Sequence, residues 1–224
     1  MAATLPESLT LDPDSKGHAA ALFFDWQFTG QNDEFLDPAR YQYREFFILV
    51  DALHQGKPVS YCPYIFVDND SAMMRGLIQG FPKRMGEVHL SRAFTAPGPA
   101  ASQVAVGARF AATASSAGQR LAHAEVKLTE KLEDLSKLGL SARPIVNMRH
   151  FPRLAAGQHD NPAVHELVMA ITDNTQLVEV WTGEGQLTLP IVDREEVSDL
   201  APVRVGAGFR ASMSYTVTDL KILV

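Results

Sequence analysis

The segment Gly80-Phe81-Pro82-Lys83-Arg84 presents a primary amine from a stiff and apolar stretch of the chain. Pro82 fixes its own backbone φ angle and biases Phe81 toward an extended conformation. A lysine amine is a nucleophile only when it is uncharged, and an apolar pocket disfavours its charged form. Lys83 in such a pocket could attack a ketone and form a Schiff base. The competing interpretation is a lysine that reaches solvent from a loop, which is the usual fate of a lysine after a proline.

Arg84 is a second cation next to the candidate nucleophile. A neighbouring positive charge also favours the neutral form of an amine, through repulsion. Adjacent side chains on an extended backbone point to opposite sides, however. We therefore expect desolvation to contribute more than Arg84 to the reactivity of Lys83.

The elements that must position Lys83 are predicted from the apolar runs before it. Residues 45–53 and 59–67 read as two strands, and the loop at 55–58 between them suits a hairpin. A short helix is expected over residues 70–78, because an Asp-Ser pair at its start is an N-cap signal. Gly80 is expected to stop this helix, so that the lysine segment follows directly.

The rest of the chain predicts many strands and few helices. Residues 128–140 space leucines at helical intervals and predict a second helix, and Gly183-Glu184-Gly185 suits a hairpin turn. Further strands are expected over residues 20–28, 87–94, 104–113, 120–127, 145–151, 164–173, 176–182, 186–191 and 205–217. The pattern predicts a mostly-β (α+β) fold, a closed or nearly closed β-barrel with a few short helices.

Composition narrows the class of protein. The chain has 224 residues, of which 46% are hydrophobic, and we expect a polar leader over residues 1–19 and a single domain over residues 20–224. A formal net charge of -6 and no basic stripe argue against a nucleic-acid partner. The leader resembles no signal peptide and no apolar run is long enough to span a membrane, so no membrane association and a cytoplasmic location are expected.

The chain contains one cysteine, Cys62, so an internal disulfide is impossible. Cys62 lies in an apolar strand, and a buried structural thiol is the favoured interpretation over a nucleophile. The seven histidines show no spacing typical of a zinc site, and no metal is expected.

The stretch from Tyr61 to Gly86 (YCPYIFVDNDSAMMRGLIQGFPKRMG) resembles the core of the acetoacetate decarboxylase family. In that family the first lysine of a Phe/Tyr-Pro-Lys-Lys-Leu-Gly-type segment forms the Schiff base, which implies this role for Lys83 and keeps a cation at Arg84. The segments Arg143-Pro144, Glu179-Val180-Trp181-Thr182-Gly183 and Asp199-Leu200-Ala201-Pro202-Val203 follow in the family's order. The resemblance covers roughly residues 20–224 and implies a homo-oligomer.

The resemblance also implies carboxylates upstream of the lysine. Glu45 occupies the matching place on the strand before the hairpin, and an exposed strand carboxylate is its alternative interpretation. Asp25 is a looser counterpart of a second family carboxylate on an earlier strand. Phe81 is implied as a substrate contact because it belongs to the lysine segment.

Two departures from the family pattern bear on the substrate. Decarboxylases carry an arginine near the N-terminus that helps to hold the substrate carboxylate, and here no arginine precedes Arg40. The family's Gly-Arg-Glu segment is replaced by Arg75-Gly76-Leu77. Gln79 instead resembles the Gln-Gly-aromatic-Pro-Lys pattern of aldolase-dehydratase members, which act on pyruvate-like 2-oxo acids, although a polar helix terminus explains Gln79 equally well.

The leading prediction is a lyase that decarboxylates a small keto acid such as acetoacetate through a Lys83 imine. The alternative is an aldolase-dehydratase that condenses a 2-oxo acid with an aldehyde through the same lysine, and a non-catalytic ligand-binding module is the third hypothesis. Glu45 is of the residue type that transfers protons. Arg75 could hold a substrate carboxylate, or could be a solvated helix residue. No cofactor is required, because the amine itself supplies the electron sink.

Overall fold

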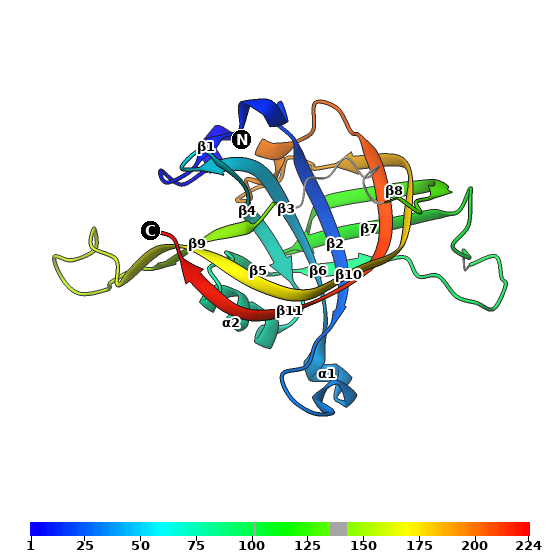
Figure 1. Ribbon diagram of the computed structural model, residues 1–224, viewed down its shortest axis with the longest axis horizontal. Helices are drawn as coiled ribbons and strands as arrows, with labels where there is room; N and C mark the ends of the chain where they lie inside the picture. Colours follow the sequence, from blue (N-terminus) through cyan, green and yellow to red (C-terminus); the bar gives the residue numbers. More distant parts are fainter. Residues whose placement is uncertain (101, 135–142) are drawn as a thin grey trace. The chain divides into compact units, whose positions relative to one another are not determined.

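The computed structural model describes residues 1–100, 102–134 and 143–224. Strands make up most of this part of the chain, and the helices are few and short (Figure 1), which confirms the mostly-β prediction. The strands are β1 (Thr10–Leu11), β2 (Ala19–Gln27), β3 (Gln42–His54), β4 (Lys57–Val67), β5 (Lys83–Met85), β6 (Glu87–Leu90), β7 (Arg109–Ser116), β8 (Gln119–Lys131), β9 (Ile145–Phe151), β10 (Val164–Thr188) and β11 (Ala207–Ile222). The α-helices are α1 (Pro38–Tyr41) and α2 (Asp70–Ile78).

The chain forms two compact units. The first comprises the described residues of Met1–Met85, Ala142–Asp173 and Val217–Val224, and the second those of Gly86–Ser141 and Asn174–Thr216. Lys83 and every other candidate site residue named above belong to the first unit. In the described part of the chain, no helix is both long and apolar enough to cross a membrane.

The sheet of the first unit is organised around β4. One edge of β4 pairs with β3 in an antiparallel register that sets Glu45 opposite Val67. β4 also pairs in parallel with β9 at Ser60 and Tyr61, and with β5 from Ile65 to Val67. β2 pairs with the far side of β3. The expected hairpin between residues 45–53 and 59–67 is confirmed, as is the helix over residues 70–78.

In the second unit, β6, β7 and β8 form an antiparallel sheet that continues into Trp181–Thr188 of β10. The three strands expected between residues 164 and 191 are one continuous strand, so the hairpin turn predicted at Gly183 was wrong. A Cβ at Gly183 would overlap the carbonyl of Lys127, and a register shift occurs between Thr182 and Gly183. Gly183 therefore allows the backbones of β8 and β10 to approach closely at a bulge. A glycine in a turn looks the same in the sequence, which is why a turn was predicted here.

Two further predictions were wrong. The helix expected over residues 128–140 is strand up to Lys131, and residues 135–140 lie outside the described part. Leu128 and Leu132 are both buried. Leucines spaced by four fit one face of a strand as well as one face of a helix, so their spacing does not distinguish the two. The barrel is not closed, since the described strand pairings form an open path that ends at β1 and β6. Closure depends on which strands pair, and residue alternation within a strand does not encode it.

The leader is an integral part of the first unit. Leu9 is buried among Ala52, Val59 and other core residues, and β1 pairs with β3. Asp12 is held by Arg143, whose guanidinium lies 2.7 Å from the Asp12 carboxylate and 3.5 Å from that of Asp51. The bond to Arg143 lowers the pKa of the Asp12 carboxyl below its ordinary value of 3.8, and bonds from the following backbone amides add to this.

We predict that Asp12→Asn destabilises the protein in a pH-dependent way. Because the folded pKa of Asp12 is lowered, its ionised form stabilises the fold above about pH 4, and this contribution is lost as the pH falls through the folded pKa. Urea unfolding between pH 3 and 7 should therefore show a difference between wild type and variant that is largest near neutrality and shrinks in acid. Asp14→Asn is the control, since it removes the same charge from an exposed position; an equal effect of both variants would contradict the assignment.

Candidate active site

Lys83 and Glu45 form a buried ion pair. Nζ of Lys83 donates to Oε2 of Glu45 at 2.9 Å, and the two side chains are only 6% and 7% exposed. Lys83 is therefore not a solvated loop lysine, and Glu45 is not an exposed strand carboxylate. A buried amine next to a buried carboxylate is an arrangement in which a proton can pass directly between the two groups.

The strand order explains how the two residues meet. β4 lies between β3, which carries Glu45, and β5, which carries Lys83. Residues paired across neighbouring strands share a face, so the pairs Glu45–Val67 and Lys83–Ile65 all point to one side. The outer strands are about 10 Å apart, which is two strand spacings. The long lysine side chain is needed to cross β4 and reach the carboxylate.

Helix α2 leaves room for this crossing at Gly76. Asn69 caps the helix by accepting a hydrogen bond from the backbone amide of Ala72, and α2 packs on β4 and β5. A Cβ at Gly76 would lie 2.8 Å from Cγ of Lys83 and closer still to Cδ and Cε. Glycine inside a helix costs about 1 kcal/mol relative to alanine. Its place here is explained by the lysine chain that passes beneath it.

Aromatic residues from β2, β3 and the connection between α2 and β5 lie around the ion pair. The indole of Trp26 donates to Oε1 of Glu45 at 2.8 Å, so the two carboxylate oxygens have separate partners. Nζ of Lys83 lies 5.2 Å from the centroid of the Tyr43 ring and 5.9 Å from that of Phe81. Both rings present π faces that attract a cation, and they exclude water from the amine.

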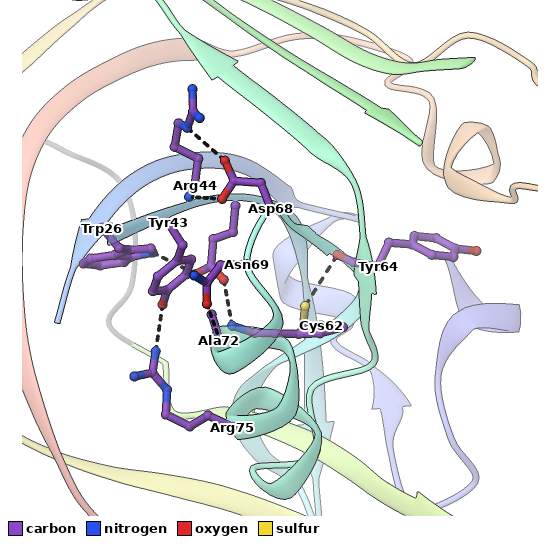
Figure 2. A network of polar contacts seen from close by, with 11 residues as sticks. Trp26, Tyr43, Arg44, Cys62, Tyr64, Asp68, Asn69, Ala72 and Arg75 are labelled. Atoms are coloured by element: carbon purple, nitrogen blue, oxygen red, sulfur yellow. Dashed lines mark hydrogen bonds and ion pairs between the residues drawn. The ribbon is translucent and has the colours of Figure 1, made fainter. Parts of the chain in front are cut away.

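Arg75 is the second cation beside this aromatic frame. It donates to the Tyr43 hydroxyl at 3.1 Å (Figure 2), and its guanidinium lies 4.1 Å from the centroid of the Phe28 ring. Figure 2 shows the Tyr43 hydroxyl pointing at Arg75 on α2, with Trp26 beside Tyr43. The guanidinium is 5.6 Å from the Tyr43 ring centroid, so Arg75 and Lys83 flank one ring. A small anion near the amine would therefore have a second positive charge close by.

Cys62 lies on the same face, in a cluster with Phe47, Ile65 and Phe81. Its thiol is fully buried and donates to the carbonyl of Tyr64 at 3.6 Å. Burial raises the pKa of this thiol, the Glu45 carboxylate raises it further, and the Lys83 amine opposes this in part. A protonated and buried thiol is a poor nucleophile, in line with the structural role expected from the sequence.

The structure brings some of the predicted site residues together and not others. Lys83, Glu45, Phe81 and Arg75 share the face described above. Gln79 is half-buried at the C-cap of α2, four positions before Lys83 in the sequence.

Arg84 and Asp25 lie elsewhere. The Arg84 guanidinium is 5.5 Å from the ring of Phe66, on the other face of the sheet from Lys83, as expected for neighbours on a strand. Asp25 is exposed and pairs across β2 and β3 with Arg44, on the face opposite Glu45. The structure does not bring either of them to the amine.

Sequence reasoning missed Trp26, Tyr43, Phe28 and Gly76. A signal for three of them was available: Tyr43 is two positions from Glu45, and Trp26 on β2 and Phe28 just beyond the end of β2 are also two positions apart. Using this signal required the β2–β3 register, which sets Trp26 opposite Tyr43 and which a single sequence does not supply. The role of Gly76 depends on the path of one side chain and has no sequence signal of its own.

Comparison with known proteins places this chain in a family. The sequence model described as acetoacetate decarboxylase (ADC) matches residues 1–224. The chain therefore belongs to the acetoacetate decarboxylase family, which confirms the family resemblance found in the sequence. No curated protein matched the chain.

Among solved structures, the chain is similar to the enduracididine biosynthesis enzyme MppR in its complex with pyruvate, with 33% identity, a TM-score of 0.88 and coverage of 99% of this chain and 82% of that one. An acetoacetate decarboxylase-like enzyme from Sphingomonas wittichii RW1 has 24% identity and a TM-score of 0.86, covering 99% of this chain and 84% of that one. The acetoacetate decarboxylase from Legionella pneumophila has 18% identity, a TM-score of 0.76 and coverage of 99% and 78%. The latter two share the fold.

We predict that Cys62 is inert in the native protein. Because burial raises the pKa of its thiol, the reactive thiolate is scarce, and labelling by a thiol reagent at pH 8 should be at least on the order of a hundredfold slower than in urea. The absorbance of the released thiolate of Ellman's reagent measures the rate, and the single cysteine makes the unfolded protein its own control. Native labelling at the unfolded rate would show that the face around Lys83 is open to solvent.

Proposed function

We propose that this protein is a Schiff-base-forming lyase in which Lys83 attacks the ketone of a small 2-oxo acid such as pyruvate and condenses it with an aldehyde. The observation that carries the proposal is the buried 2.9 Å contact between the Lys83 amine and the Glu45 carboxylate. The similarity to MppR, solved with pyruvate and with the condensation product of pyruvate and imidazole 4-carboxaldehyde, favours condensation over decarboxylation. The sequences of the decarboxylases are more distant, at 17% and 18% identity.

The first step is the release of the amine lone pair. In the resting site Glu45 and Lys83 are paired, so transfer of the ammonium proton to the carboxylate frees the amine without the help of solvent. The neutral amine then adds to the ketone carbon, and the carbinolamine loses its hydroxyl as water to give an iminium ion. Glu45, now protonated, is the acid that protonates this leaving hydroxyl.

The iminium ion then acts as the electron sink. Loss of a proton from the adjacent methyl carbon gives an enamine, which attacks the carbonyl carbon of the aldehyde and forms a carbon–carbon bond. Elimination of the new hydroxyl as water gives a conjugated iminium, and hydrolysis releases the product and restores the amine. The ionised Glu45 carboxylate is within reach of the amine nitrogen and can take part in each proton transfer.

Arg75 is the proposed anchor for the substrate carboxylate. A guanidinium has five N–H donors in a planar fork that fits a carboxylate, and Tyr43 accepts from one of them. Stacking on Phe28 holds the plane of the guanidinium. A carboxylate bound there would bring the ketone of a 2-oxo acid toward the amine, which lies beside the same Tyr43 ring.

We predict that borohydride traps a pyruvate adduct on Lys83. Lys83→Arg should abolish the adduct while it keeps a cation beside Glu45, because a guanidinium stays protonated and forms no Schiff base. Lys57→Arg, at an exposed lysine, is the matched control and should label like wild type. Peptide mass spectrometry locates the adduct, and labelling that persists in Lys83→Arg would refute the role of Lys83.

Assays of the wild-type protein with different substrates distinguish the three functional hypotheses. Condensation predicts a conjugated absorbance band from pyruvate plus an aromatic aldehyde. Carbon dioxide release from acetoacetate without that band would point to decarboxylation. An absence of trapping with either acid would leave a non-catalytic ligand-binding module.

We predict that Gly76→Ala slows imine formation by about a hundredfold. The added methyl group occupies the path of the Lys83 side chain and displaces the amine, and misplacement by about 1 Å can cost this much in rate. The measurement is the initial rate of borohydride-trapped adduct with pyruvate. Met74→Ala changes an exposed position on the same helix and should leave the rate unchanged. A wild-type rate in Gly76→Ala would show that the lysine reaches its site by another path.

A further inference from the structure

Asn147 is a buried amide that the mechanism above does not use. Its residue is 1% exposed, and neither Nδ2 nor Oδ1 has a hydrogen-bond partner among the described residues. Leaving a buried polar group unpaired costs about 1–3 kcal/mol, so such groups in native proteins are normally satisfied by the protein, by water or by a ligand. In Asn147, both the donor Nδ2 and the acceptor Oδ1 are without a hydrogen-bond partner among the described residues.

Asn147 points to the same face of the sheet as Lys83. Its neighbour Val146 packs with Tyr61 in the core on the other face, so Asn147 faces the opposite way. Arg149, two residues along β9 and therefore on the Asn147 face, donates to the carbonyl of Ile78 at the end of α2 at 3.2 Å. The face that carries Asn147 is thus the one that α2 covers.

The backbones of Asn147 and Lys83 lie a distance apart that a small molecule can span. β9 and β5 follow one another along the same partner strand, with Tyr61 beside Val146 and Ile65 beside Lys83. If the pairing of Tyr61 with Val146 is continued by one residue, Asn147 lies beside Cys62 of β4. Cys62 is three residues before Ile65, the partner of Lys83, and three residues of a strand span about 10 Å.

The connection between α2 and β5 passes over Asn147. Gly80 has a left-handed backbone with φ +82°, and a Cβ there would lie 3.2 Å from Cβ of Asn147. Phe81, the next residue, packs against Cys62 and lies near the Lys83 amine. Asn147 and the amine therefore border the same short segment of chain.

We propose that the Asn147 amide binds a hydroxyl group of the compound held at Lys83. A hydroxyl both donates and accepts, so it satisfies Oδ1 and Nδ2 together, whereas a carboxylate satisfies only the donor. In the condensation reaction, the adduct of the enamine and the aldehyde carries such a hydroxyl, on the second carbon beyond the ketone carbon. The inference rests on the proposed function, and it assigns a preference for 4-hydroxy-2-oxo acids.

The test compares 4-hydroxy-2-oxopentanoate with 2-oxopentanoate, which lacks only the hydroxyl. Half-saturating concentrations for borohydride trapping are measured with wild type and with Asn147→Leu, which replaces the amide with an apolar group of similar size. Wild type should bind the hydroxy acid more tightly, and Asn147→Leu should weaken that binding about tenfold and leave 2-oxopentanoate unaffected. The Tm of Asn147→Leu should equal or exceed that of wild type, because an unpaired buried amide is removed.

Two results separate the proposals. If wild type traps both acids at equal half-saturation, or if Asn147→Leu shifts both acids equally, the amide is satisfied by water or acts through structure, and the Asn147 assignment is overturned alone. If wild type traps neither acid, the Schiff-base function fails and the Asn147 assignment falls with it. Asn147→Ser, a smaller substitution, replaces the leucine variant if the latter does not fold, with the same expected loss of preference.

Discussion

The candidate site depends on one constraint: a positive and a negative charge are buried together, and neither can be removed alone without leaving the other unpaired. Loss of one partner of a buried pair typically costs about 3–5 kcal/mol. Lys83 and Glu45 sit on strands separated by β4, so the pair forms only if β3, β4 and β5 are all in register. The same contact therefore reports correct assembly of the sheet and, in the proposed mechanism, supplies the proton acceptor that frees the amine.

Different strands and helices provide the residues that surround this pair. β2 and β3 provide Trp26 and Tyr43, which orient the carboxylate and cover the amine. α2 provides Arg75 as a second positive charge and Gly76 as open space for the lysine chain. The second cation of the lysine segment, Arg84, is directed to the other face. The surroundings of the amine are thus the buried Glu45 carboxylate and the aromatic rings, and Arg84 faces away from it.

The sequence predicts the elements that carry the site better than it predicts their assembly. The hairpin from β3 to β4, helix α2 and its stop at Gly80 follow from local signals, and the family motif singles out Lys83 as the candidate nucleophile. The aromatic neighbours of Lys83 could not be predicted in the same way. Trp26 and Tyr43 are placed near it by the pairing register between β2 and β3, which a single sequence does not give. The continuity of β10 was hidden by Gly183, whose missing side chain admits the backbone of β8.

The N-terminal segment has a consequence for how the protein is handled. Leu9 is packed into the core beneath Ala52 and Val59, and Asp12 shares Arg143 with Asp51. Trimming the chain to the first long strand, a common choice when a leader is polar, would open this part of the core to water and leave the guanidinium with a single carboxylate. Fusion partners and affinity tags are better placed ahead of Met1 than in place of the residues that follow it.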